Sequence, residues 1–233
     1  MDEFFSALMN ETIRHAMDCE MVPSDYFLTW TRVHEWKFTR EKPHFLVTSI
    51  SRVTDQKIYL LRQPGLKHPS ALEDILDILG PDNLYVFIGT GTKEHEEFLT
   101  RTSAKWPNFI FLRAFASDEC VNAVYGNGDL FLMPSSFEPC GISQMLAMRE
   151  GQPCLVHGVG GLRDTVINKK NGFVFSGNSL KDQIENMVGT FENAMRMYEN
   201  EPDGYEKIRE NAAGVKFLWD DSVQQYIDIL YKF

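Results

Sequence analysis

This chain of 233 residues is short of basic side chains, of paired cysteines and of long apolar runs. Its 23 Lys and Arg stand against 33 Asp and Glu, a net charge of −10, whereas a nucleic-acid partner demands clustered cations. No apolar run approaches the roughly 18 residues that a membrane span needs. The four cysteines show no C-x-x-C spacing and no nearby histidine pair, which argues against a metal site. We therefore expect no nucleic-acid partner, no membrane and no metal.

The N-terminal segment contains no glycine, and the first glycine of the chain is Gly65. Apolar residues from Phe4 to Ile13 recur at helical spacing, and aromatic residues from Tyr26 to Phe38 predict a second helix. We interpret residues 1–42 as a helical N-terminal extension that packs on a main domain, not as a binding element. Its acidic start lacks a signal-peptide core, and unpaired thiols fit a reducing compartment, so we expect a cytoplasmic protein.

From Phe45 onward, short apolar strands alternate with helical segments. Strands are expected at residues 45–50, 84–88, 109–112, 129–133, 153–157 and 173–175. The tail from residue 180 is expected to be helical. Strands that are apolar on both faces and alternate with helices predict an α/β fold. We therefore expect residues 43–233 to form a Rossmann-like doubly wound parallel sheet of about six strands.

Ligands of such a sheet bind beyond the carboxyl ends of its strands. Arg52 and Lys57 follow the first predicted strand, and a Gly89-x-Gly91 loop follows the second. Residues 138–143 and 158–165 follow the fourth and fifth. Two cations, glycine loops and a helix start near Ile142 describe a diphosphate site, where free backbone N–H groups meet the anion.

Each of these features also has a plainer interpretation. Taken alone, Arg52 and Lys57 are more typical of ordinary surface charges. Gly89-x-Gly91 is too short for a dinucleotide fingerprint and is more typical of a simple turn. Glu138 stands between Phe137 and Pro139 at a strand-to-helix turn. A carboxylate there suits hydrogen bonds from sugar hydroxyls, and its alternative role is a cap on the following helix.

Three ordered motifs resemble those of bacterial glycogen synthases and plant starch synthases. SRVTDQK at residues 51–57 resembles R-x-T-x-Q-K. FEPCG at 137–141, with QM at 144–145 and AMR at 147–149, resembles F-E-P-C-G-L-x-Q-x-x-A-M-R. GGLRDTV at 160–166 resembles G-G-L-x-D-T-V. The resemblance covers roughly residues 45–233 and includes the aromatic residues of the tail.

The resemblance implies one Rossmann-like half, the C-terminal donor-binding half, of a GT-B glucosyltransferase. Such an enzyme transfers glucose with retention from ADP-glucose or UDP-glucose to an α-1,4-glucan, and needs no cofactor. By this resemblance Arg52 and Lys57 hold the diphosphate, Glu138 binds the glucose hydroxyls, and these three form the catalytic set. The other expected contacts of the nucleotide sugar are Gly89, Gly91, Phe115, Cys140, Gly141, Ile142, Ser143, Gly160, Gly161, Leu162, Asp164, Thr165 and Val166.

Some positions depart from the family pattern. Ile58 replaces the usual glycine after the Q-K pair, Leu146 stands where many related transferases have glutamate, and the base-stacking aromatic falls at Ala116 or, shifted by one, at Phe115. No acceptor-binding N-terminal domain is recognisable. Three functions stay open: a donor half that pairs with a separate or excised acceptor domain, a noncatalytic binding or regulatory protein, and a retaining transferase for another nucleotide sugar.

Overall fold

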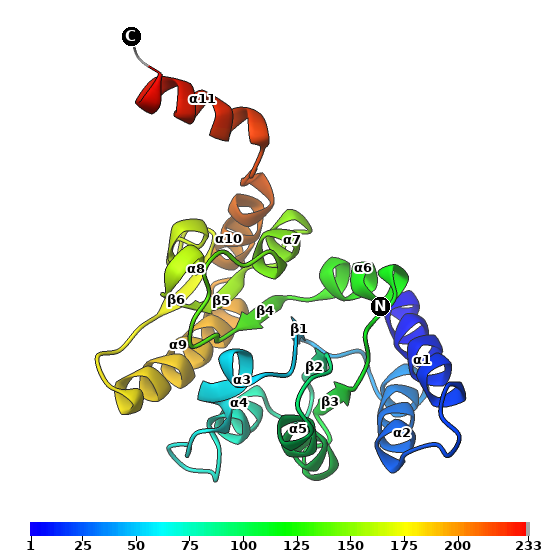
Figure 1. Cartoon of the computed structure of the whole chain (residues 1–233). Helices are drawn as coiled ribbons and strands as arrows, with labels where there is room; N and C mark the ends of the chain where they lie inside the picture. The colour runs from blue at the N-terminus through cyan, green and yellow to red at the C-terminus, as the bar shows by residue number, and fades with distance from the viewer. Residues whose placement is uncertain (232–233) are drawn as a thin grey trace.

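The computed structural model describes residues 1–231 and contains a six-stranded parallel sheet in the order β3-β2-β1-β4-β5-β6 (Figure 1). This is the strand order of a doubly wound Rossmann sheet. The predicted fold class is therefore confirmed. The strands are β1 (Leu46–Ile50), β2 (Leu84–Ile88), β3 (Phe109–Leu112), β4 (Leu130–Met133), β5 (Cys154–His157) and β6 (Gly172–Phe175).

The chain winds outward from the middle of the sheet twice, in opposite directions. It runs from β1 through β2 to the edge strand β3, returns to β4 beside β1, and then proceeds through β5 to β6. Ile50 is in register with Ile88, and Ile88 with Leu112, so the carboxyl ends of these strands lie at one edge. The switch point between β1 and β4 is where such a sheet opens a crevice for ligands.

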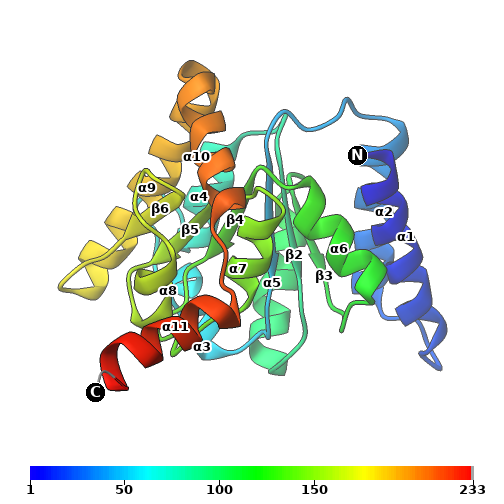
Figure 2. The same cartoon turned by 90° about the horizontal axis from the view of Figure 1, so that it is seen from above.

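One face of the sheet is covered by helices that connect the first three strands and by two helices of the tail. Side chains of this face include Val47, Phe87 and Phe111, all buried in one apolar cluster. The connecting helices over β1–β3 and the tail helices over β4–β6 divide the face between them (Figure 2). The helices are α3 (Asp55–Arg62), α4 (Ala71–Leu79), α5 (Lys93–Lys105), α9 (Leu180–Asn200) and α10 (Pro202–Gly214).

The opposite face is also covered in two parts. Over β4–β6 lie α7 (Ser143–Arg149) and α8 (Gly160–Thr165), with α6 (Asp118–Asn127) next to the switch point. Over β1–β3 lie α1 (Asp2–Met17) and α2 (Ser24–Phe38), which we call the N-terminal hairpin. The hairpin fills the part of the sheet that the β1–β2 and β2–β3 connections leave bare, because those connections cross on the other face.

The hairpin shares a hydrophobic core with the sheet. Phe4, Phe5 and Leu8 of α1 and Trp36 of α2 are buried in one cluster with Ile110 and other strand residues. The N-terminal extension therefore packs on the main domain, as the aromatic pattern indicated. The boundary after residue 42 stays a prediction, since hairpin and sheet share this core.

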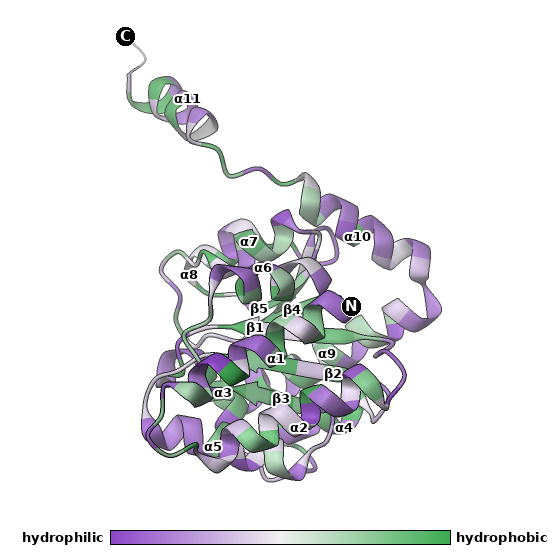
Figure 3. Ribbon diagram, turned by 90° about the vertical axis from the view of Figure 1, so that its right-hand side faces the viewer, coloured by the Kyte–Doolittle hydropathy of each residue, from purple (hydrophilic) through white to green (hydrophobic). Residues whose placement is uncertain are grey.

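The last helix has a different environment. α11 (Trp219–Leu230) stands clear of the sheet and its helices (Figures 1 and 3). Trp219 is 84% exposed and Ile229 is 75% exposed. Apolar side chains of this helix therefore face solvent instead of a core. Within residues 1–231, no helix is both long and apolar enough to cross a membrane.

Candidate functional site

The loops that follow β1 and β2 are in close contact at the carboxyl edge of the sheet. Val53 and Gly91 form an isolated parallel bridge. A Cβ atom on Gly89 would lie 1.9 Å from the carbonyl oxygen of Ser51, and one on Gly91 would lie 2.1 Å from that of Val53. Glycine is needed at both positions because any side chain would collide with the neighbouring backbone. The Gly89-x-Gly91 motif thus holds the Arg52 loop in place.

Lys57 and Glu138 meet across the switch point. Lys57 lies in the first turn of α3, Glu138 follows β4, and the lysine Nζ forms an ion pair with Glu138 Oε2. Only 11% of the Lys57 side chain and 8% of the Glu138 side chain are exposed. The Ser135 hydroxyl donates to the same carboxylate oxygen at 3.3 Å. The fold therefore brings together a predicted cation and the predicted carboxylate, 81 residues apart in sequence.

Hydrogen bonds of Gln56 join the loops that carry this pair. The Gln56 side-chain amide donates to the Phe137 carbonyl at 2.7 Å, and the backbone carbonyl of Gln56 accepts from the Ser136 N–H at 2.9 Å. Gln56, next to Lys57, and Ser136 and Phe137, just before Glu138, thus fix the position of Lys57 relative to Glu138. Gln56 belongs to the predicted motif, but these hydrogen bonds between the two loops were not predicted.

His157, at the end of β5, contacts the segment that carries Glu138. Its Nδ1 lies 3.1 Å from the Ser135 carbonyl oxygen, and its ring stacks on Phe175 with centroids 5.0 Å apart. Burial lowers the pKa of His157, although the bond to Ser135 opposes this. The ring is therefore neutral at pH 7, and Nδ1 donates because the carbonyl only accepts. Sequence reasoning missed His157; its signal was a polar residue at the carboxyl end of a strand.

The glycine loop after β5 packs directly against the Glu138 loop. Gly160 has a φ of +46°, and a Cβ there would lie 1.9 Å from the Glu138 carbonyl oxygen. A Cβ on Gly161 would lie 2.4 Å from the Cys140 carbonyl oxygen. The Gly161 N–H donates to Glu138 O at 3.0 Å. Both predicted glycines are therefore required for this close approach.

Gln144 fixes the segment of residues 140–143. Its buried side-chain amide donates to the carbonyls of Gly141 at 3.0 Å and Cys140 at 3.3 Å, and to the Thr165 hydroxyl at 3.2 Å. Gly141 adopts a φ of +77°, which favours glycine. α7 then starts at Ser143, close to the predicted helix start. The N–H groups of a first helical turn have no partner inside the helix and are available to a ligand.

The remaining predicted contacts differ in exposure. The Arg52 and Asp164 side chains are exposed, and Phe115 is 83% exposed after β3. Leu162 and Val166 are buried in the core beneath α7 and α8, so any contact they make with a ligand would be through the backbone. Their roles as ligand contacts stay predictions.

This arrangement of groups suits a ligand with both hydroxyls and phosphates. A carboxylate accepts hydrogen bonds from hydroxyls, while an ammonium group, an exposed guanidinium and free backbone N–H groups favour anions. Each of them comes from a segment that follows the carboxyl end of a strand, and Lys57 and Glu138 meet where β1 lies beside β4.

The family model described as glycosyl transferases group 1 matches residues 65–215. The chain belongs to this glycosyltransferase family. Its curated relatives include glycogen synthases. That of Desulfitobacterium hafniense is 34% identical over 199 residues, which cover 82% of this chain and 40% of the relative. That of Lactococcus lactis is 35% identical over 188 residues, which cover 79% of this chain and 37% of the relative. The chain thus spans about 40% of the length of these relatives.

Solved structures with the same fold include a starch synthase and HepE, both with bound ligands. The catalytic domain of starch synthase IV from Arabidopsis thaliana, bound to ADP and acarbose, has a TM-score of 0.68 and 25% identity, and the match covers 86% of this chain and 41% of that one. HepE from Anabaena, in complex with UDP and glucose, has a TM-score of 0.59 at 18% identity, covers 91% of this chain and 53% of that one, and shows the fold alone. The fold is that of one Rossmann-like half of a GT-B glycosyltransferase.

Proposed function

We propose that this chain is the nucleotide-sugar-binding half of a glycogen or starch synthase-like glucosyltransferase. The observation that carries the proposal is the contact of Lys57 with Glu138 at the switch point. It joins two of the three matched motifs, and a third, at Gly160 and Gly161, packs on the same loop. The donor we propose is ADP-glucose or UDP-glucose, without a metal or other cofactor.

Each group of the site has a role in this proposal. Lys57 and Arg52 bind the diphosphate, and Glu138 accepts hydrogen bonds from the glucose hydroxyls. The backbone N–H groups of residues 140–143 and the glycines after β2 and β5 approach the sugar and phosphates. Phe115 stacks on the base, a role that an exposed aromatic ring at this edge supports.

The proposed reaction is a front-side displacement. The bond between the glucose C1 and the leaving phosphate oxygen breaks, and the acceptor oxygen forms a bond to C1 on the same face. The proton of the acceptor hydroxyl passes to the departing phosphate oxygen. Lys57 and Arg52 stabilise the charge on that phosphate through charge-assisted hydrogen bonds.

We further propose that an α-glucan is the acceptor and that a separate or excised N-terminal half binds it. Charge-assisted hydrogen bonds from Lys57 and Arg52 supply about 3–6 kcal/mol together, whereas enzymes lower barriers by at least about 8 kcal/mol. Acceptor positioning supplies the difference and requires a facing domain. The exposed apolar side chains of α11 support such a partner, since they suit a protein surface. The free cysteines support a cytoplasmic location.

Calorimetry tests donor binding. The chain should bind ADP, UDP or their glucose conjugates, and Lys57→Ala should weaken the affinity at least about tenfold, because a charge-assisted hydrogen bond is lost. Lys181→Ala is the matched control, since that side chain is 81% exposed on α9. Absence of binding at millimolar concentration, together with no effect of Lys57→Ala, would contradict the proposal.

A noncatalytic role is the second candidate, because the chain spans only about 40% of its relatives. A binding or regulatory protein would bind the nucleotide sugar without turning it over. Incubation with a donor and a malto-oligosaccharide, alone and with an N-terminal half of a glycogen synthase, separates the two. Glucosyl transfer only in the mixture supports the half-enzyme, and transfer in neither supports the binding protein.

A further inference from the structure

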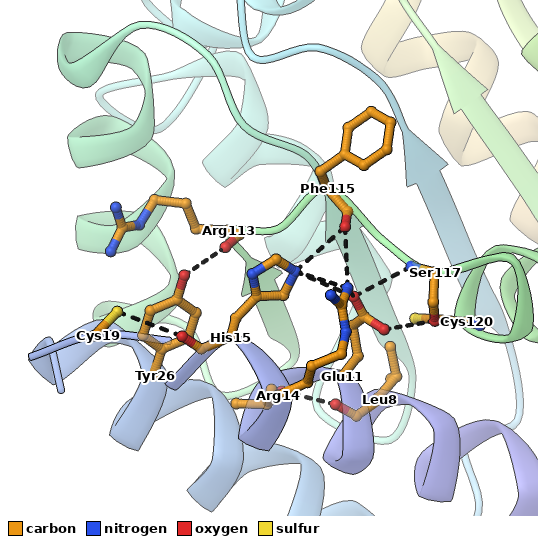
Figure 4. Close-up of polar contacts among 11 residues, drawn as sticks. Leu8, Glu11, Arg14, His15, Cys19, Tyr26, Arg113, Phe115, Ser117 and Cys120 are labelled. Atoms are coloured by element: carbon orange, nitrogen blue, oxygen red, sulfur yellow. Dashed lines mark hydrogen bonds and ion pairs between the residues drawn. The ribbon is translucent and has the colours of Figure 1, made fainter. Parts of the chain in front are cut away.

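The N-terminal hairpin holds the loop that follows β3, residues 113–117, at every second residue. Its contacts reach Arg113, Phe115 and Ser117, which lie between the end of β3 and the start of α6 (Figure 4). The partners come from both helices of the hairpin, which is distant from this loop in sequence. Such regular anchoring fixes the path of a loop that would otherwise be free to adopt several conformations.

Glu11 of α1 anchors the end of this loop. Its carboxylate is 3% exposed and accepts from the Ser117 hydroxyl at 2.6 Å and from the Ser117 N–H at 3.2 Å. Arg14 pairs with the same carboxylate. Burial raises the pKa of Glu11, but the hydrogen bonds from Ser117 and Arg14 lower it more, and the result lies below the usual 4.5. The carboxylate is therefore charged at neutral pH and binds the loop through two donors.

Phe115 is held by its carbonyl group and not by its ring. Arg14 Nη2 donates to the Phe115 carbonyl at 3.3 Å, and His15 Nε2 lies 3.3 Å from the same oxygen and 3.1 Å from Glu11 Oε1. Figure 4 shows the Phe115 ring pointing away from the hairpin, and 83% of this residue is exposed. The hairpin thus fixes the backbone from one side and leaves the ring free on the other.

α2 anchors the beginning of the same loop. Asp25 accepts from Arg113 Nε at 2.7 Å, and the Tyr26 hydroxyl donates to the Arg113 carbonyl at 2.9 Å. The loop also adjoins the candidate site, because the Gly89 N–H donates to the Leu112 carbonyl at 3.1 Å. The loop after β2 is therefore bonded to the loop after β1 and to the last residue of β3, directly before loop 113–117.

We infer that the N-terminal hairpin is a positioning element of the donor site, in which Glu11 holds loop 113–117 so that Phe115 is presented to the base of a nucleoside diphosphate. This inference rests on the proposed function. Glu11 touches no ligand in this scheme and acts through Ser117 and Phe115. An anchored loop binds more tightly because its conformational entropy is already lost in the free protein.

The test compares ADP with inorganic pyrophosphate, which lacks the base. Glu11→Ala should lower the affinity for ADP about tenfold, the scale of one base–aromatic stack, and leave the affinity for pyrophosphate unchanged. Phe115→Ala should have the same effect. The double variant should be no weaker than Phe115→Ala alone, because Glu11 acts through that ring. Glu11→Gln, which still accepts from Ser117, should recover part of the loss.

Controls separate positioning from folding. Glu3→Ala removes an exposed carboxylate from the same helix and should change neither affinity. Circular dichroism reports whether each variant is folded. If Glu11→Ala does not fold, Arg14→Met removes one donor to the Phe115 carbonyl from a side chain that is 48% exposed, and should weaken ADP binding alone.

Distinct results overturn distinct claims. If the unmodified chain binds ADP but Glu11→Ala and Arg14→Met bind it equally well, the inference is wrong and the proposed function stands. Equal losses for ADP and pyrophosphate would also overturn it, because they indicate a general structural effect. Failure of the unmodified chain to bind either ligand would contradict the proposed function itself.

Discussion

The N-terminal hairpin and α11 are both rich in aromatic and aliphatic residues, yet they use them in opposite ways. Phe5 and Trp36 of the hairpin are 1% and 2% exposed against the sheet, whereas Trp219 and Tyr226 of α11 are 84% and 58% exposed. The hairpin covers a bare sheet face, and α11 stands clear of the sheet (Figure 3). An amphipathic pattern therefore predicts a helix and an apolar face, but not where the partner of that face lies.

The largest expected effect comes from truncating a hairpin aromatic. Phe5→Ala should lower the free energy of unfolding by about 3–5 kcal/mol, because it leaves a cavity in the core. Trp219→Ala should change it by less than about 0.5 kcal/mol, since surface substitutions rarely do more. Urea unfolding followed by circular dichroism measures both. Similar losses in the free energy of unfolding for the two variants would contradict the contrast between a buried hairpin and an exposed α11.

Thiol labelling probes whether the hairpin stays docked. Cys120 is 1% exposed beneath α1, and burial raises its pKa from 9.0 to about 12. Cys140 is exposed. At pH 8 iodoacetamide should label the exposed Cys140 much faster than the buried Cys120, because the thiolate is the nucleophile and the reagent must reach it. Peptide mass spectrometry resolves the sites. Labelling of Cys120 at the rate of Cys140 would show that the hairpin detaches readily.

The acidic anchor of the hairpin should make stability depend on pH. The folded-state pKa of Glu11 lies below its unfolded value of 4.5, so its stabilisation is present above that pH and is lost as pH falls through the folded pKa. Above pH 4.5, Glu11→Gln should be about 1.5–3 kcal/mol less stable than the unmodified chain. Asp228→Asn on α11 is the control. A gap for Glu11→Gln that does not narrow on acidification would contradict the assignment.

The smallest expected effect lies on α11. Ile229→Lys places a charge where the side chain is 75% exposed, and should change the free energy of unfolding by less than about 0.5 kcal/mol. It should nevertheless weaken any association that buries this face, because a lysine is costly to desolvate there. Sedimentation of the chain together with an acceptor half measures this association. The proposal that this face meets the acceptor half fails if association is unchanged.

Much of the fold was predictable because strand periodicity is a local property. The predicted strand at residues 84–88 matches β2, and the helix expected to begin near Ile142 starts at Ser143. α8 was not predicted, because Gly160 and Gly161 are poor helix formers and suggested a loop. Its helical turn is compatible with the tertiary contacts of both glycines.

The site was predictable only in part, since a motif gives residue order without orientation. Lys57 and Glu138 were expected at the same edge, but their direct contact depends on a strand order that brings β1 beside β4. A polar residue at the carboxyl end of a strand marks His157 as a candidate, but its contact with the Ser135 carbonyl, 22 residues away, is not recorded in any local pattern. Likewise, the contact of Glu11 with Ser117 spans 106 residues, and no local pattern records it.

The Lys57–Glu138 pair also has a consequence for which ligands the proposed donor site selects. In the free protein the ammonium and the carboxylate neutralise each other. A lone small anion must compete with Glu138 for Lys57 and leaves a nearly buried carboxylate unpaired, which is costly. A ligand that brings hydroxyl donors together with its phosphates satisfies both groups at once. In the proposed function, the pair therefore favours molecules in which both chemistries are joined, and a simple anion such as pyrophosphate should bind the same groups more weakly.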